Sequence, residues 1–198
     1  MSSSIHSFSD LREANSPHLI PFLEIQSKRP DPNHFLAESE LVLQRALQSN
    51  WAVQSVLGTP ARLQRLRLHA QNHCILIEVK QQELNQWVGF DLHRGCIGQI
   101  KIPTSSEPQS LDFSELPNRI VVAERHSDPA NIGTLLRNAR ALGADMVVLD
   151  SKGASPYCRK TARASAGQLF TQPFRVMDSR SFVRTVKKSA RHRILGAT

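Results

Sequence analysis

Residues 119–150 read RIVVAERHSDPANIGTLLRNARALGADMVVLD, and this stretch decides the fold class. The apolar runs 119–124 and 145–150 have the length and β-branched content of buried strands. Between them, 132–143 places apolar side chains at helical spacing, and Gly143 permits a left-handed stop. Because a helix joins the two strands, they are predicted to lie parallel in one sheet, with right-handed crossovers and helices on both faces.

The chain after residue 150 continues the alternation of strands and helices. We expect a basic helical stretch around 158–169, a short strand near 173–177, a helix over 181–190 and a last strand over 193–198. Units of this kind predict a parallel α/β domain over 119–198.

A smaller α/β pattern precedes this domain. Residues 34–49 have apolar side chains at mostly helical spacing and predict an amphipathic helix, and 61–71 predicts a second one. Strands are expected at 53–58, at 74–79 and within 93–103. Residues 103–118 hold three prolines and four serines without a sustained period, which is typical of a linker. The predicted organisation is an arm (1–19), a small domain (20–102), a linker (103–118) and the parallel domain (119–198).

The charge of the chain favours a polyanionic partner. Lys and Arg number 25 against 17 Asp and Glu, which gives a net charge of +8. Between residues 159 and 193 there is one acidic residue, Asp178, and few aromatic residues, so this basic segment is expected to contact phosphates. Its ten basic residues are Arg159, Lys160, Arg163, Arg175, Arg180, Arg184, Lys187, Lys188, Arg191 and Arg193.

Several classes of function are excluded by composition and motif. The three cysteines are odd in number and widely spaced, and the eight histidines form no ligand cluster, so neither a disulfide framework nor a metal site is expected. No apolar run reaches the length of a membrane span, and we expect a soluble, cytoplasmic protein. The dinucleotide-binding, P-loop and nucleophile-elbow glycine patterns are all missing.

The stretch 128–144, DPANIGTLLRNARALGA, resembles the first motif of the SpoU/TrmH branch of the SPOUT methyltransferases. Residues 155–173 resemble the next segment of that family. Residues 35–38 and 93–95 resemble the start and end of the family's small substrate-binding domain, which is similar to RNA-binding ribosomal proteins. Ser39 stands where family members carry glycine. The resemblance implies a small N-terminal α/β RNA-binding domain followed by a parallel α/β domain of the trefoil-knot type.

The resemblance also implies an enzyme that transfers a methyl group from S-adenosylmethionine to a ribose 2′-hydroxyl of structured RNA, with ribosomal RNA favoured over transfer RNA. By resemblance Arg137 contacts the target ribose-phosphate and activates the hydroxyl, and Asn131 orients Arg137 or the nucleotide. Arg163 and Ser165 are candidates for RNA contact.

Each of these residues also has an alternative explanation that the sequence leaves open. Helical periodicity places Arg137 nearly opposite the apolar face, as a solvated arginine. Asn131 is a common turn residue, and the two can converge on one ligand only if Asn131 belongs to the turn before the helix. For Arg163 and Ser165, solvation and packing respectively are equally good explanations.

Family members carry two further motifs after the strand expected at 193–198, and their backbones wrap the methyl donor. The sequence to Thr198 does not contain them. The donor pocket is therefore expected to be incomplete, and the 198-residue chain is expected to be inactive alone. Homodimerisation is expected from the family. A non-catalytic RNA-binding protein and a plain protein-binding α/β scaffold remain alternatives.

Overall fold

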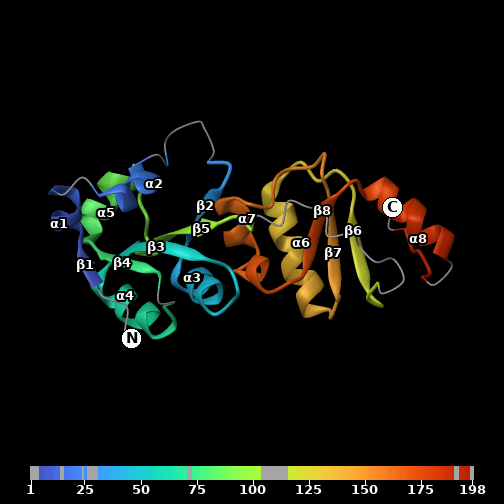
Figure 1. Cartoon of the computed structure of the whole chain (residues 1–198), viewed down its shortest axis with the longest axis horizontal. Coiled ribbons are helices and arrows are strands. Elements are labelled where there is room, and N and C mark those ends of the chain that lie inside the picture. The colour runs from blue at the N-terminus through green and yellow to red at the C-terminus, as the bar shows by residue number, and fades with distance from the viewer. Residues whose placement is uncertain are drawn as a thin grey trace.

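The computed structural model describes residues 5–13, 16–23, 25, 31–70, 73–103, 116–189 and 192–196. These residues form two α/β domains that follow one another along the long axis of the molecule (Figure 1). The N-terminal domain holds a five-stranded sheet and the C-terminal domain holds a three-stranded parallel sheet. The α/β fold class expected from the sequence is confirmed. Most of the linker, 104–115, lies outside the described residues.

The sheet of the N-terminal domain has the order β1-β4-β3-β5-β2. Strands β1 (Ile5–Ser7), β4 (Ile75–Glu78) and β3 (Val53–Gly58) are parallel to one another. Strand β5 (Cys96–Lys101) runs antiparallel to β3 and to the edge strand β2 (His34–Glu38).

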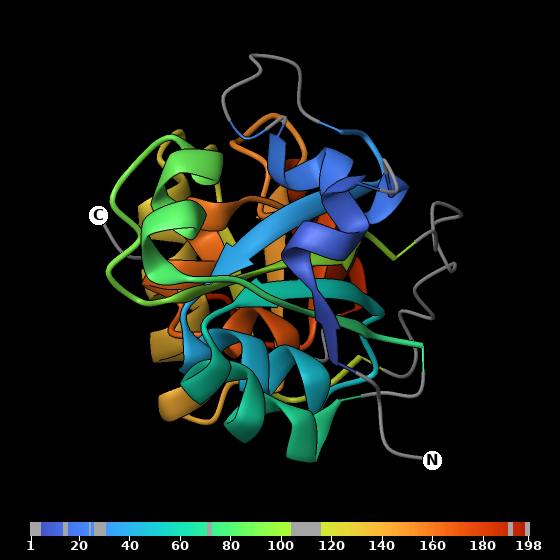
Figure 2. The same cartoon turned by 90° about the vertical axis from the view of Figure 1, so that its left-hand side faces the viewer.

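Helices cover both faces of this sheet (Figure 2). On one face, α3 (Glu40–Leu47) and α4 (Pro60–Leu66), which is extended by the 3-10 turn Arg67–His69, pack their leucines against β3 and β4. On the other face lie α1 (Phe8–Glu13), the 3-10 turn Pro17–Leu19, α2 (Ile20–Leu23) and α5 (Gln81–Val88), with a core that includes Phe8, Phe22 and Leu84. Burial of these apolar faces is the main stabilising contribution.

Two expectations for this domain are corrected. Residues 34–38 form a strand and not the first half of a helix, because Phe35 and Ala37 are buried in register with Ile100 and Gly98 of β5. Residues 5–23, where described, belong to the domain, since β1 pairs with β4 and Leu19 is buried. They do not form a separate arm. Helix α5 had no counterpart in the sequence-based expectations.

In the C-terminal domain β7 (Met146–Asp150) lies between β6 (Ile120–Ala123) and β8 (Phe174–Met177). Helix α6 (Pro129–Ala141), α7 (Arg159–Ala164) and the 3-10 turn Gln168–Phe170 cover one face. Helix α8 (Ser179–Ser189) covers the other face, with Phe182 and Val186 against Met146 and Val148. The elements expected between 119 and 189 and the covering of both faces are confirmed.

The strand expected at 193–198 is not formed over the described residues 193–196. Ile194 and Leu195 remain exposed, and these residues pair with no strand in the described part of the chain. A strand is stable only when a neighbouring edge takes up its backbone hydrogen bonds. The trefoil knot implied by the resemblance stays a prediction.

Candidate active site

The turn between β6 and α6 is held by the Asp128 side chain. Its carboxylate accepts a hydrogen bond from the Ala130 N–H at 2.9 Å, which caps the helix, and it pairs with Lys160 Nζ of α7 at 2.8 Å. The bond from Lys160 and then the bond from the Ala130 N–H hold the pKa of Asp128 below its usual value. Pro129 at the first helical position is pre-organised for the helix. The start of α6 is therefore tied to α7.

Gly133 brings α6 and α7 into close contact. A methyl group at this position would lie 2.6 Å from the Thr161 carbonyl oxygen and 2.7 Å from Ala164 Cβ. The Thr161 hydroxyl also donates to the Pro129 carbonyl at 3.0 Å. The small residues of the segments 128–144 and 155–173 thus have a packing role. Close packing of this kind makes the surface formed by α6 and α7 rigid.

Arg137 lies one helical turn after Gly133 and is exposed. Its guanidinium has no hydrogen-bond or ion-pair partner among the described residues, so nothing in this part of the chain consumes its donors. A protonated guanidinium with free donors is suited to bind phosphate or ribose oxygens. The position fits both a solvated arginine and a ligand-binding one.

Asn131 belongs to the first turn of α6 and not to the loop before it. Six helical residues place Asn131 and Arg137 about 9 Å apart along the axis and about 120° apart around it. The condition under which the two were expected to converge is therefore not met in this structure. Asn131 is exposed at the start of the helix, and its N–H bonds to the Asp128 carbonyl at 3.1 Å.

Ser165 is fully buried. Its hydroxyl donates to the Ala162 carbonyl at 2.9 Å and accepts from the N–H groups of Gly167 and Leu169 at 3.2 Å. These bonds close the turn that follows α7. Direct contact of the Ser165 side chain with RNA would require this turn to open, so the geometry favours the packing explanation.

Arg163 joins the two domains through Glu38. Its Nη1 donates to Glu38 Oε1 at 3.0 Å, and Arg159 Nη1 lies 3.7 Å from Glu38 Oε2. Glu38 is only 4% exposed, so its charge is compensated across the domain boundary. Arg45 of α3 adds a bond to the Ala166 carbonyl at 2.5 Å. The sequence did not predict these contacts, because the partners are more than 100 residues apart.

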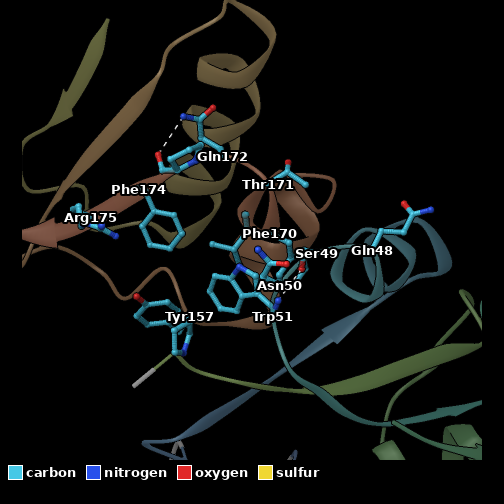
Figure 3. Close-up of a pocket in the computed structure, with 13 residues that line it drawn as sticks. Gln48, Ser49, Asn50, Trp51, Tyr157, Phe170, Thr171, Gln172, Phe174 and Arg175 are labelled. Atoms are coloured by element: carbon cyan, nitrogen blue, oxygen red, sulfur yellow. Dashed lines mark hydrogen bonds between the residues drawn. The ribbon is translucent and has the colours of Figure 1, made fainter. Parts of the chain in front are cut away.

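An aromatic cluster continues the same boundary and encloses a cleft of about 500 Å³ between the domains (Figure 3). Phe35 and Phe170 stack at 6.3 Å between ring centroids, and Trp51 contacts Phe170 edge-on at 5.3 Å. Tyr157 and Phe174 complete the cluster on the side of the C-terminal domain. Sequence reasoning missed this cleft.

The carboxyl ends of the three parallel strands carry acidic side chains that are already paired. Glu124 after β6 binds Arg180 at 2.7 Å, Asp150 at the end of β7 accepts from the Ser179 hydroxyl, and Asp178 lies 3.6 Å from Lys152. The bond from Ser179 is the largest cause that lowers the pKa of Asp150. These acidic groups are therefore paired within the protein at the edge where parallel α/β sheets bind ligands.

The loop 151–155 packs directly on the loop after β6 at this edge. The Ala154 N–H donates to the His126 carbonyl at 2.8 Å, and a methyl group on Gly153 would lie 2.9 Å from the same oxygen. The two loops are therefore held together at this edge, and we assign none of their residues to the methyl donor.

The basic segment 159–193 is divided by the fold. Arg159, Lys160, Arg163 and Arg180 have acidic partners. Arg184, Lys187 and Lys188 are exposed on α8, on the side away from the buried Phe182 and Val186. Four of the ten basic residues expected to contact phosphates are thus paired within the protein.

Two searches of the described residues returned nothing. No group of three or more His, Cys, Asp or Glu side chains in these residues could hold a metal ion. None of the helices found in them is long and apolar enough to cross a membrane.

Comparison with known proteins shows which family the C-terminal domain resembles. Residues 118–198 match the model of the SpoU rRNA Methylase family. The C-terminal part of the chain is therefore similar to the SpoU RNA methyltransferases. The chain is 29% identical over 198 residues to an uncharacterized tRNA/rRNA methyltransferase of Mycobacterium tuberculosis, a match that covers 96% of this chain and 67% of that protein. Over 152 residues it is 25% identical to a 23S rRNA uridine 2′-O-methyltransferase of Streptomyces viridochromogenes, covering 75% of this chain and 52% of the relative.

Solved structures of SpoU-type proteins share the fold. The AdoMet-bound rRNA methyltransferase from Sinorhizobium meliloti superposes with a TM-score of 0.70 at 20% identity, over 94% of this chain and 69% of that one. The SpoU methyltransferase AviRb from S. viridochromogenes, also in complex with AdoMet, gives 0.66 at 20% identity, over 88% and 67%. The chain spans about two thirds of the length of these proteins.

Proposed function

We propose that this chain contributes the RNA-binding part and the catalytic arginine of a methyltransferase that modifies a ribose 2′-hydroxyl of structured RNA. Support comes from the SpoU match over 118–198 and from relatives named as rRNA 2′-O-methyltransferases. The observation that carries the proposal is the exposed guanidinium of Arg137, without a partner in the described residues, on a helix whose packing to α7 is tight. Ribosomal RNA is the favoured substrate.

The methyl donor in this proposal is S-adenosylmethionine, which supplies an electrophilic methyl group to the attacking oxygen. Structural neighbours bound to AdoMet support this choice. A guanidinium offers only hydrogen-bond donors, so Arg137 would polarise the hydroxyl and anchor the adjacent phosphate rather than act as a base. Asn131, on another side of α6, would contact a neighbouring nucleotide. Dimerisation and a cytoplasmic location remain predictions.

Arg137→Ala tests the proposal. In a form of the protein that includes a donor-binding segment, this variant is expected to lose about 10²-fold or more in methylation rate, as removal of a charge-stabilising donor does in other enzymes. The measurement is transfer of a labelled methyl group to ribosomal RNA, with thermal unfolding as the check on the fold.

Arg140→Ala is the matched control, because Arg140 is also exposed on α6 and has no partner among the described residues. Its methylation rate is expected to stay within about twofold of the unchanged protein. Normal methylation by a folded Arg137→Ala variant would show that Arg137 is only a solvated arginine.

A non-catalytic RNA-binding protein is the second candidate. It is favoured by the acidic side chains at the carboxyl edge of the described sheet, which are already paired within the protein. Both candidates bind RNA, and only the first transfers a methyl group.

A further inference from the structure

The cleft between the domains has the chemistry of a nucleobase site. Three half-buried rings, Trp51, Tyr157 and Phe174, lie 6.0 to 6.5 Å from one another between centroids, and they come from three separate segments of the chain. Figure 3 shows them gathered at the cleft, with Arg175 beside Phe174. Planar aromatic faces that line a cleft can stack any base, because every base has a π-face.

Polar groups surround these rings. Asn50 and Thr171 line the cleft and are exposed. The Asn50 amide can donate to and accept from the edge of a base, and the Thr171 hydroxyl, which donates to Gln168, can accept. Arg175 is exposed, and its positive charge opposes the rise in the pKa of the Tyr157 phenol that burial causes. Because Arg175 lines the same cleft beside Phe174, its guanidinium can bind the phosphate that accompanies a stacked base.

The alternative explanation for these rings is structural. Phe35 and Phe170 are 7% and 5% exposed and serve as the packed centre of the cluster. Trp51, Tyr157 and Phe174 are more exposed than that centre, although they cover the same boundary. A surface that only joined two domains would not need to leave three rings, an amide, a hydroxyl and an arginine around 500 Å³ of open space.

We propose that this cleft binds one unpaired nucleotide of the RNA, with its base stacked on Trp51, Tyr157 and Phe174 and its phosphate on Arg175. The inference rests on the proposed RNA-binding function and adds a preference for unpaired bases. A fully paired duplex cannot supply such a base without breaking a pair. Since both domains line the cleft, a nucleotide bound there would contact both domains at once.

Tryptophan fluorescence can report on the cleft alone. The chain has two tryptophans, and Trp87 is partly buried in the N-terminal domain, against Phe8 and Arg12. In a Trp87→Phe background, Trp51 emission is expected to be quenched by an RNA hairpin with an unpaired loop. A blunt duplex with the same number of phosphates is expected to bind more weakly and to leave the emission unchanged.

Two variants and a control complete the test. Tyr157→Ala and Arg175→Ala are each expected to weaken loop RNA by roughly tenfold, the loss typical of removing one base stack or one charged contact. Duplex binding, measured by fluorescence anisotropy, should change much less for Tyr157→Ala. Arg184→Ala removes one exposed charge on α8, away from the cleft, and should weaken loop and duplex RNA equally.

The outcomes separate the two proposals. If both RNAs bind equally well and Trp51 emission does not change, the proposed nucleotide site in the cleft is wrong, whereas the proposed RNA binding is retained. Equal quenching of Trp51 emission by the duplex would also contradict the proposed site for an unpaired base. If neither RNA binds, the proposed function itself fails.

Discussion

Ser39 shows what one residue contributes at the point where β2 turns into α3. Its backbone has φ 88° and ψ 145°, a conformation that is accessible to glycine and costly for other residues. The side chain is 4% exposed, and its hydroxyl has no hydrogen-bond partner among the described residues. The turn is nevertheless needed, because the Ser39 N–H and carbonyl bond to Cys96 and Leu43.

Replacing Ser39 with glycine is therefore expected to stabilise the protein. The variant removes backbone strain and a buried unpaired hydroxyl, and both changes stabilise the folded state. Together they should outweigh the entropic cost of folding glycine, so that the free energy of unfolding rises by about 1 kcal/mol. Urea unfolding measures the change in the free energy of unfolding. Ser55→Gly is the control, since Ser55 is also buried with an unpaired hydroxyl but lies in the extended β3, where glycine should destabilise. A loss of stability in Ser39→Gly would contradict the assignment of strain.

At the scale of elements, the packing of α6 on α7 decides how the motif helix is presented. Gly133 lies at the crossing, and the hydroxyl of Thr161 and the pair Asp128–Lys160 join the same two helices. In most helices a glycine-to-alanine change stabilises the protein. At Gly133 it is expected to destabilise the protein, because the space for the methyl group is already occupied.

Gly133→Ala is expected to destabilise the protein by about 1–2 kcal/mol, since a Cβ 2.6 Å from a backbone oxygen forces the helices apart. Thr134→Ala, at the neighbouring exposed position of α6, should be neutral or slightly stabilising. Both free energies come from urea unfolding. Equal free energies of unfolding for Gly133→Ala and Thr134→Ala would show that α6 and α7 do not approach each other as closely as described.

At the scale of the molecule, the division of the basic segment determines the salt dependence of RNA binding. Log affinity is expected to fall with log salt by roughly 0.7–0.9 for each phosphate contact. Lys188→Gln should reduce the magnitude of this slope by about that amount, because Lys188 is exposed on α8. Lys160→Gln should reduce it much less, because Asp128 already balances its charge. Filter binding across a salt series measures the slopes, and a flat dependence for the unchanged chain would argue against phosphate contacts.

The 198-residue chain is expected not to bind S-adenosylmethionine measurably. At the carboxyl edge of the described sheet, Glu124 is already paired with Arg180 and Asp150 with Ser179, and the loop at Gly153 packs on the loop after β6. Calorimetric titration of the chain with the donor is the measurement, with RNA binding as the check that the protein is folded. Saturable binding in the micromolar range would show that a donor site is present.

The sequence by itself determined the elements whose signals are local. The apolar strands 120–123 and 146–150, the helix between them and the cap at Asp128 follow from spacing and side-chain chemistry within about 30 residues. The motif residue Arg137 could be named from the same stretch. Its exposure agrees with the helical period, although its role remains to be tested.

Only the tertiary structure decided where distant segments meet. Residues 34–38 have helical spacing but form a strand, because pairing with β5 outweighs the local pattern. Asn131 lies in the first turn of the helix, and Ser165 is a buried packing residue. Glu38 binds Arg163, which is 125 positions away in the sequence. The cleft of Trp51, Tyr157 and Phe174 has no local signal at all. Contacts of this kind arise from the burial of apolar surface between domains, which depends on the whole arrangement of the chain.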